Sequence, residues 1–568
     1  MFSQLPTDSN EFKTWDWARL EPYFKDLEAR AINDSNVIDW LSDWARVSNI
    51  ISETYSRLSV ATTVDTTDEA ATQAYINYIE HVIPPAQAAG QALKEKLLAS
   101  GIEPPNYSIE LRDMRTEADL FRDENLPLQT EEGKLGTDFD KVIGAQTVVL
   151  DGEEKTLPAL KPIYLDTDRS KREQAWRLAS ERQLADRGTL NELWGKFLKI
   201  RTQMAANADM ADFRAYRWRD FKRFDYTPED CLTFHRAIEE VAVPAAQRIY
   251  ERRRQRLGLD KLRPWDLDVD PEGKEPLKPA ADAAQMEAIT AQIFHKVDPQ
   301  LGNYFEIMRS EGLLDLPNRK GKAPGGYCTY YNVVKRPFIF MNAVGVHDDV
   351  QTLLHEGGHA FHAFEGSKLP DYRNGGAPIE FCEVASMSME LLAAPYLTKD
   401  QGGFYDNAAD AARARVEHLE GVILFWPYMA VVDAFQHWVY THQEEAFDPA
   451  NCDRVWGEQW DRFMKGIDYS GLEDSKVTGW HRKLHIFQIP FYYVEYGLAQ
   501  LGAVQVWRNS LQNQAQAVAD YRSALALGGT EPLPKLFAAA GAKFAFDAET
   551  MRQCVDLAER TINELDPA

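Results

Sequence analysis

The stretch His355-Glu356-Gly357-Gly358-His359 is the most informative part of this 568-residue sequence, because it decides the class of fold. On a helix, side chains four positions apart lie one turn above each other, so both histidines face the same way. Glu356 lies about 100° round the axis, beside that face. Two imidazoles that share a face with a neighbouring carboxylate are the pattern of a zinc site that carries its own general base.

Residues around this stretch predict a buried helix over 352–364. The positions outside the motif are mostly apolar: Leu353, Leu354, Ala360, Phe361, Ala363 and Phe364. Buried ionisable side chains need partners, and a metal ion supplies one. The glycine pair costs a helix about 2 kcal/mol relative to two alanines, which indicates that a substrate or another backbone approaches closely.

A catalytic zinc site commonly takes three protein ligands, and we expect Glu383 to be the third. Loop residues at 367–377 precede a second predicted helix at 378–392, so two antiparallel helices can bring Glu383 beside the histidines. Glu380 is expected to be an exposed residue at the helix start, and Glu390 could accept a hydrogen bond from a ligand histidine. His362 is expected to be a structural neighbour, since three ligands and water already complete the site.

These segments resemble the M3 family of zinc oligopeptidases, in particular its oligoendopeptidase F and Pz-peptidase branch. The resemblance rests on His355-Glu356-Gly357-Gly358-His359-Ala360-Phe361-His362 and on Phe381-Cys382-Glu383-Val384-Ala385-Ser386. The stretches at 321–328 and 337–342 agree, and 485–487 with 490–496 resembles the His/Tyr-rich segment of the branch. The similarity extends from about residue 190 to the C-terminus and reaches the first third only through length and helical character.

The resemblance implies a zinc-dependent metalloendopeptidase that hydrolyses internal bonds of short unfolded oligopeptides. His355, His359 and Glu383 would bind one zinc ion per chain, and Glu356 would be the general base acting on a zinc-activated water. His485, Tyr493 and Tyr496 would contact substrate or transition state. We favour Tyr493 and Tyr496 because residues three apart share a helical face, while Tyr492 remains an alternative.

The resemblance also implies a mainly α fold in which two helical lobes enclose a deep substrate channel, with a zincin-type HExxH active site and a small β-sheet. Residues 1–185 would form an N-terminal helical region with a small hairpin, serving as channel wall or lid, and 186–568 the catalytic region. Apolar periodicity predicts helices at 11–30 with a break at Pro22, 36–58, 68–81, 86–100 and 108–123, then at 404–441, 453–464 and 491–511. Strands at 147–150 and 156–160 suggest the hairpin.

Residues 336–344 are the strongest candidate for a β-strand, because Phe338, Ile339 and Phe340 are residue types that favour strands. This strand precedes the zinc helix directly. We therefore expect an extended peptide to add to its edge through main-chain hydrogen bonds, which accept any sequence.

Composition argues against a nucleic-acid-binding, secreted or membrane-spanning protein. The formal charge of −25 argues against nucleic acid, whose phosphates would be repelled. No secretory signal is visible at the N-terminus, and the longest apolar run, 421–432, is too short to span a bilayer. The 5 cysteines are scattered without a CxxC pair and are expected to be reduced. The sequence predicts a cytoplasmic protein without a membrane partner and leaves its oligomeric state open.

Two alternatives remain. A peptidyl-dipeptidase or carboxypeptidase would use the same chemistry with an added cation that binds the substrate's terminal carboxylate. A catalytically silent peptide-binding scaffold would keep the fold and the metal. The presence of Glu356 together with all three expected ligands argues against the scaffold, because the chemistry needs the base.

Overall fold

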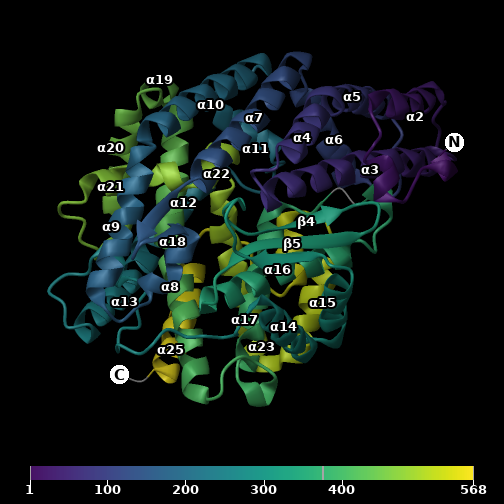
Figure 1. Cartoon of the computed structure of the whole chain (residues 1–568). Helices are drawn as coiled ribbons and strands as arrows, with labels where there is room; N and C mark the ends of the chain where they lie inside the picture. The colour runs from purple at the N-terminus through teal and green to yellow at the C-terminus, as the bar shows by residue number, and fades with distance from the viewer. Residues whose placement is uncertain (1, 374–375, 567–568) are drawn as a thin grey trace.

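The computed structural model describes residues 2–373 and 376–566, which fold into a mainly helical protein with two small sheets (Figure 1). Asn374 and Gly375, part of the loop expected at 367–377, lie outside the described residues. No helix in the described ranges is both long enough and apolar enough to cross a membrane.

The N-terminal helices build a hydrophobic core of their own, which extends from Phe2 to Leu111. They are α1 (Ser9–Phe12), α2 (Trp17–Ala29), α3 (Val37–Val64), α4 (Glu69–His81), α5 (Ile83–Ser100) and α6 (Ser108–Leu120). The helices predicted here are confirmed with shifted ends, but the break at Pro22 is wrong. Pro22 is the sixth residue of α2, so it removes only one hydrogen bond, to Ala18, early in the helix.

A helix and a hairpin follow. Helix α7 (Leu126–Gly144) was not predicted. Strands β1 (Thr147–Leu150) and β2 (Glu153–Thr156) confirm the hairpin, but the second strand predicted at 156–160 is wrong, because β2 ends at Thr156 and Pro158–Leu160 form a 3-10 helix. Asp151 and Gly152 have φ values of 54° and 81°, the left-handed conformation of a two-residue turn, so pairing restarts directly after Gly152.

The second sheet has the strand order β3-β5-β4, and β5 (Arg336–Ala343) lies in its middle. It pairs in parallel with β3 (Leu314–Pro317) and antiparallel with β4 (Tyr327–Tyr331). The strand predicted at 336–344 is thus confirmed, but the expectation that its edge receives a peptide is wrong, because both of its edges are paired. The two outer strands are β3 and β4.

Helices cover both sides of this sheet. In Figure 1, α3 passes along β4, and α16 (His347–Gly366) lies against β5. The Thr63 hydroxyl lies 2.5 Å from the Tyr327 hydroxyl, which ties the N-terminal region to the outer strand β4. Helix α17 (Ile379–Ala393) packs between α16 and α23 (Tyr493–Leu525), which is kinked at Asn513.

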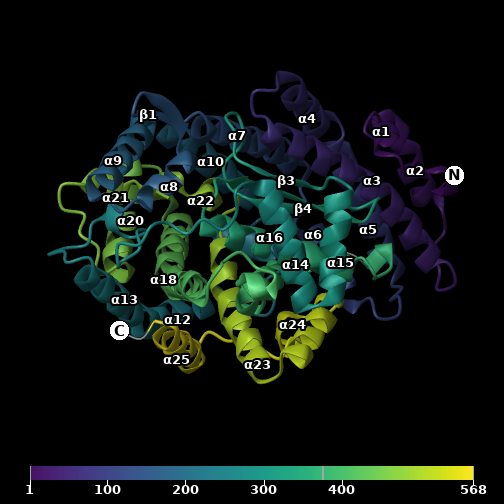
Figure 2. The same ribbon diagram turned by 60° about the horizontal axis from the view of Figure 1, so that its bottom comes forward.

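One group of the remaining helices packs around α18 (Ala408–Thr441) in the main core, and the others lie against α7, α16, α17 or the hairpin (Figure 2). These remaining helices are α8 (Lys161–Tyr164), α9 (Arg169–Ala185), α10 (Arg187–Asn207), α11 (Phe213–Asp220), α12 (Pro228–Ala237), α13 (Val243–Arg256), α14 (Ala283–Val297), α15 (Pro299–Ser310), α19 (Gln443–Ala446), α20 (Pro449–Phe463), α21 (Glu473–Val477), α22 (Leu484–Gln488), α24 (Leu533–Ala539) and α25 (Ala548–Leu565).

Candidate metal centre

The glycine pair of the motif lets α16 pack tightly on its neighbours. A Cβ atom added at Gly358 would lie 2.5 Å from the Ala385 carbonyl oxygen and 2.5 Å from the Ser386 Cα, both in the backbone of α17. A Cβ at Gly357 would lie 2.5 Å from the ring of Phe294. The close approach expected from the sequence is therefore made by another backbone at Gly358 and by an aromatic ring at Gly357.

Replacing Gly358 by Ala should force α16 and α17 apart, because backbone atoms cannot turn aside as a side chain can. We expect a loss of about 3 kcal/mol of stability, the upper range for overpacking, together with reduced zinc binding. Thermal unfolding and metal content would measure both. Gly366→Ala on the same helix is the matched control, since its added methyl meets open space. Equal stability of the two variants would contradict this packing argument.

Three potential ligands converge where α16 meets α17. The Nε2 atoms of His355 and His359 lie 3.3 and 3.4 Å from Oε2 of Glu383. One donor atom from each of the three side chains lies within 4.8 Å of the others. Burial opposes ionisation of Glu383, but the neighbouring His359 and His355 outweigh it and hold the pKa of its carboxyl well below the usual range. Two nitrogen donors and one carboxylate fit a zinc ion.

Glu390 orients His355 through a hydrogen bond, and His418 in turn holds Glu390. Nδ1 of His355 donates to Oε1 of Glu390 at 2.7 Å, so its Nε2 is left facing Glu383. Nε2 of His418, on α18, lies 2.8 Å from the other oxygen of Glu390. Although burial opposes ionisation, these two histidines lower the pKa of Glu390 to about 2. Sequence reasoning suggested the role of Glu390 but missed His418, which has no motif spacing to reveal it.

Replacing Glu390 by Gln should weaken zinc binding roughly 10- to 100-fold, the usual cost of losing a group that orients a ligand histidine. Competition with a chelator of known affinity would measure it. Glu417→Gln, one residue from His418 on the same helix, makes the same chemical change away from the centre and should leave affinity unchanged. An unaltered affinity in the Glu390 variant would refute the supporting role.

Glu356 faces a cavity of about 420 Å³ that the expected ligands also line. Its side chain is 5% exposed, and Oε2 has no hydrogen-bond partner among the described residues. Burial raises the pKa of the Glu356 carboxyl, while His355 and His359 oppose this shift. A buried carboxylate without a partner beside two imidazoles is available to hold and deprotonate a water molecule.

The outer strand β4 forms one wall of this cavity. Residues 326–330, which include most of β4, line it together with α16, α17, Tyr492 and Tyr496. Since no strand of the described residues pairs with the other side of β4, its backbone groups there can pair with an extended chain.

The expected catalytic tyrosines differ in where they lie. Tyr496 lines the cavity, and its hydroxyl lies 3.3 Å from Nε2 of His485. Tyr492 lines the cavity and donates to Oε1 of Glu383 at 2.6 Å. Tyr493 is not in the cavity lining: its hydroxyl accepts from Lys483 at 3.1 Å, and its ring packs on Tyr428.

His485 is held as a neutral imidazole. Burial, with a smaller effect of the Lys483 ammonium, lowers its pKa to about 3. A neutral ring can accept a hydrogen bond from the Tyr496 hydroxyl through Nε2 or donate one to its oxygen, so His485 can position that phenol.

A strained residue aims Tyr492 at the ligands. Phe491 has a φ of 68°, which a bulky side chain rarely adopts. Its amide donates to Gln436 at 2.7 Å, and its carbonyl accepts from Arg223 at 2.5 Å. The surrounding structure thus fixes the turn immediately before α23.

The predictions for His362 and Glu380, two neighbours of the expected ligands, have different outcomes. His362 lines the cavity but packs its ring on Phe381, and burial lowers its pKa to about 3. The expectation that Glu380 is exposed is wrong. It is 3% exposed and accepts from the Tyr226 hydroxyl at 2.6 Å, because α17 is buried from its first turn.

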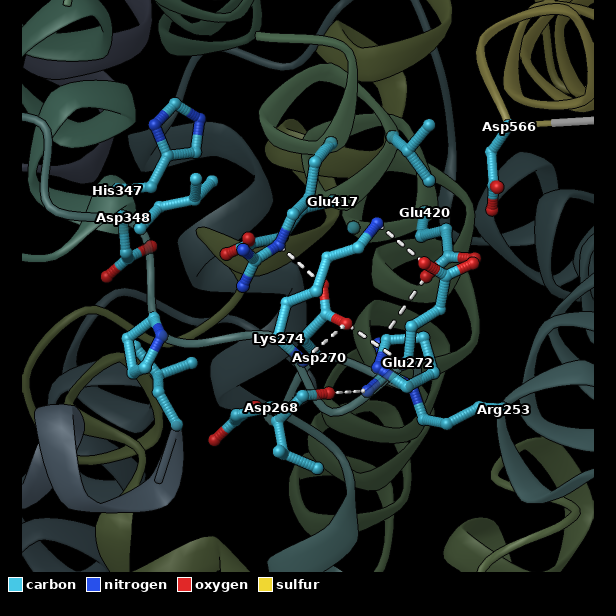
Figure 3. Close-up of a pocket in the computed structure, with 18 of the residues that line it drawn as sticks. Arg253, Asp268, Asp270, Glu272, Lys274, His347, Asp348, Glu417, Glu420 and Asp566 are labelled. Carbon is cyan, nitrogen blue, oxygen red and sulfur yellow. Dashed lines mark hydrogen bonds and ion pairs between the residues drawn. The ribbon is translucent and has the colours of Figure 1, made fainter. Parts of the chain in front are cut away.

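A second cavity, of about 510 Å³, lies between α13, α18 and the start of α16 (Figure 3). Asp268, Asp348 and Glu417 are among the residues that line it. Burial and the nearby Asp348 raise the pKa of Glu417 to about 7. Within the described residues, the groups of three potential metal ligands are His355-His359-Glu383 and Cys231-Asp433-His437, and neither lines this second cavity. The candidate catalytic site is therefore the cavity of about 420 Å³ that His355, His359 and Glu383 line.

Comparisons with known proteins agree with this site. A family model described as peptidase family M3 matches residues 164–555. Oligopeptidase PepF of Bacillus subtilis (strain 168) is 22% identical over 435 residues, which are 71% of this chain and 61% of that protein. An oligoendopeptidase F homolog of Mycoplasma pneumoniae is 32% identical over 142 residues, 24% of this chain and 22% of its own length. The chain thus matches less than two thirds of the length of these curated relatives.

Solved structures match over greater lengths. Pz peptidase A with inhibitor 2 has a TM-score of 0.92 and 27% identity, with 100% of both chains covered. Oligoendopeptidase F from Enterococcus faecium has a TM-score of 0.62 at 16% identity, with 97% of both chains covered, which bears on the fold alone. Because the family model spans more than half of the sequence and includes the helix that carries His355, Glu356 and His359, the chain belongs to peptidase family M3.

Proposed function

We propose that the protein is a zinc-dependent oligoendopeptidase that hydrolyses internal bonds of short, unfolded peptides. The observation that carries the proposal is the convergence of His355, His359 and Glu383 beside Glu356, in a cavity bounded by an outer β-strand. Nε2 of each histidine and the Glu383 carboxylate would hold the ion. When bound, zinc would acidify water and polarise the scissile carbonyl.

The residues of the chain supply the proton transfers. Glu356 would take a proton from the attacking water and pass it to the leaving amine. A carboxyl with a raised pKa suits both steps, because it is a stronger base than an ordinary glutamate and holds the proton until the amine takes it.

Tyr496 is the best-placed donor for the developing oxyanion, with His485 positioning its hydroxyl. Tyr492 would instead orient Glu383, with which it shares a short hydrogen bond. Tyr493, which the sequence favoured beside Tyr496, would stabilise the aromatic cluster through Lys483 and Tyr428. These assignments rest on which hydroxyls face the cavity.

Substrate selection would follow from backbone pairing along β4. An extended peptide can add to this strand whatever its sequence, whereas a folded protein cannot offer a free strand inside the cavity. Residues 1–185 would form the wall or lid over this groove, a role supported by the contact between Thr63 and Tyr327. Residues 186–568 would form the catalytic region.

We place the protein in the cytoplasm. All five cysteines are free thiols, which suits a reducing compartment. Its charge of −25 disfavours nucleic-acid partners.

Incubation with blocked-end peptides of graded length and with a folded protein, with and without a chelator, tests the function. Chelator-sensitive internal cuts in the short peptides alone are expected when fragments are identified by mass. Trimming of free-ended peptides only would favour a peptidyl-dipeptidase or carboxypeptidase. Absence of any cleavage by zinc-loaded protein would favour a silent peptide-binding scaffold.

A further inference from the structure

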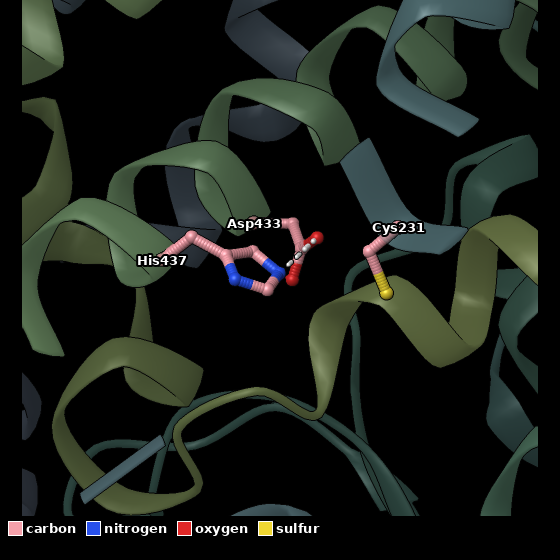
Figure 4. Close-up of side chains that lie close together, drawn as sticks. All are labelled: Cys231, Asp433 and His437. Atoms are coloured by element: carbon pink, nitrogen blue, oxygen red, sulfur yellow. Dashed lines mark ion pairs between the residues drawn. The ribbon is translucent and has the colours of Figure 1, made fainter. Parts of the chain in front are cut away.

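A second group of metal-ligand side chains lies where α12 meets α18. Cys231 and His235 are four residues apart on α12, and Asp433 and His437 are four residues apart on α18. Each helix therefore presents two such side chains on one face. All four are buried, with exposed fractions between 0% and 5%. Figure 4 shows Cys231, Asp433 and His437 gathered between the helices.

Their ligand atoms lie at separations that a small ion could bridge. One atom from each of Cys231, Asp433 and His437 lies within 4.8 Å of the other two. Nε2 of His235 lies 2.8 Å from Oδ2 of Asp433, and Nε2 of His437 lies 3.4 Å from the same oxygen. Ligands of a tetrahedral zinc with bonds of about 2.0–2.3 Å stand roughly 3–4 Å apart.

The protein alone leaves this group incompletely satisfied. Oδ1 of Asp433 and Nε2 of His437 are buried without a hydrogen-bond partner among the described residues. Buried polar atoms are rarely left without a partner. Two such atoms on two of the three ligand-type side chains indicate a missing partner at this position.

Charge also favours a cation. A divalent ion bound by the Asp433 carboxylate and a Cys231 thiolate gives zero net charge, which removes the cost of burying an unpaired anion.

We propose that Cys231, Asp433 and His437 bind a structural zinc ion that joins α12 to α18, with His235 holding Asp433 through a hydrogen bond. All three ligands are buried away from both cavities, which suits a structural rather than a catalytic ion. None of the four lines either cavity described above. The site would brace α18, the helix that also supplies His418 to the catalytic centre.

One contact must change when the ion binds. Nη1 of Arg214 lies 3.3 Å from Nδ1 of His437, where it faces a nitrogen lone pair. With Nε2 on the metal, Nδ1 carries the proton, and Arg214 loses its acceptor. Arg214 is half-buried, so its guanidinium can turn towards water.

Cobalt substitution separates the two centres, because the catalytic ligands include no cysteine. We expect elemental analysis of the purified full-length protein to give two zinc ions per chain, and one in His355→Ala. The cobalt-loaded protein should show a near-ultraviolet thiolate-to-cobalt absorption band that Cys231→Ser abolishes. Cys382→Ser removes the thiol in the lining of the catalytic cavity and should keep the band.

The unaltered protein already provides the decisive measurement, so a poorly folding variant cannot obscure the result. One zinc ion per chain and no thiolate band after cobalt loading would overturn the proposal. A band that disappears in Cys382→Ser but persists in Cys231→Ser would overturn it as well. Failure of the proposed peptidase function would leave both readouts unchanged, because neither depends on turnover.

Discussion

Replacement of Glu356 by Gln should lower kcat/KM roughly 10²- to 10⁴-fold and leave zinc bound. The amide keeps the size of the side chain, so the cavity and the ligands His355, His359 and Glu383 are preserved. It cannot accept a proton from water, which removes the contribution of the general base. Steady-state cleavage of an internally quenched peptide, with metal content measured on the same preparation, tests both parts of this expectation.

Asp348→Asn is the matched control. It makes the same carboxylate-to-amide change on α16, but at an exposed position that is paired with Lys161. This variant should cleave peptide within a few-fold of the unaltered protein. Normal turnover by the Glu356 variant would refute the mechanism, and loss of zinc from it would show that the substitution had disturbed the ligands instead.

The centre could be predicted from sequence where its geometry follows local rules. The i, i+4 spacing places His355 and His359 on one face, whatever surrounds them. Predicting Glu383 needed one further inference, namely that a short loop joins two antiparallel helices. The close approach of Gly358 to the α17 backbone shows that these two helices pack side by side. His418 reaches Glu390 from a distant helix, so only the tertiary fold reveals it.

Other elements lacked a periodic signal. Helix α7 contains Gly133, Gly136 and Gly144, which weaken its helix propensity. Tertiary packing of the buried Leu135 and Phe139 in the main core selects the helix instead. Strand β4 is half-buried along four of its five residues, so the alternation that marks most outer strands is absent.

The tyrosines show where helical periodicity stops being informative. Tyr493 and Tyr496 do lie on α23 three residues apart, and their ring centroids are 5.4 Å apart. A shared face does not decide which hydroxyl meets the cavity, because Lys483 holds that of Tyr493 elsewhere. Tyr492 precedes the helix, and the strained Phe491 sets its direction, so no helical spacing applies to it.

Tyr496→Phe should lower kcat roughly 10²- to 10³-fold with little change in KM or zinc content, which is the usual effect of losing one oxyanion donor. The substitution removes only a hydroxyl, so the packing of the ring against His485 is kept. The loss should appear in kcat because the substrate carbonyl gains its negative charge only as the transition state forms. Steady-state kinetics on one internally quenched peptide would separate kcat from KM.

Tyr493→Phe is the matched control, since it removes the same atom from the neighbouring ring that faces Lys483. We expect it to change kcat only a few-fold. Tyr492→Phe should act differently again, by weakening zinc binding about 10-fold through the lost hydrogen bond to Glu383. A larger effect on kcat at Tyr493 than at Tyr496 would assign the role of oxyanion donor to Tyr493. The first residues of α23 would then have to turn towards the cavity when substrate binds.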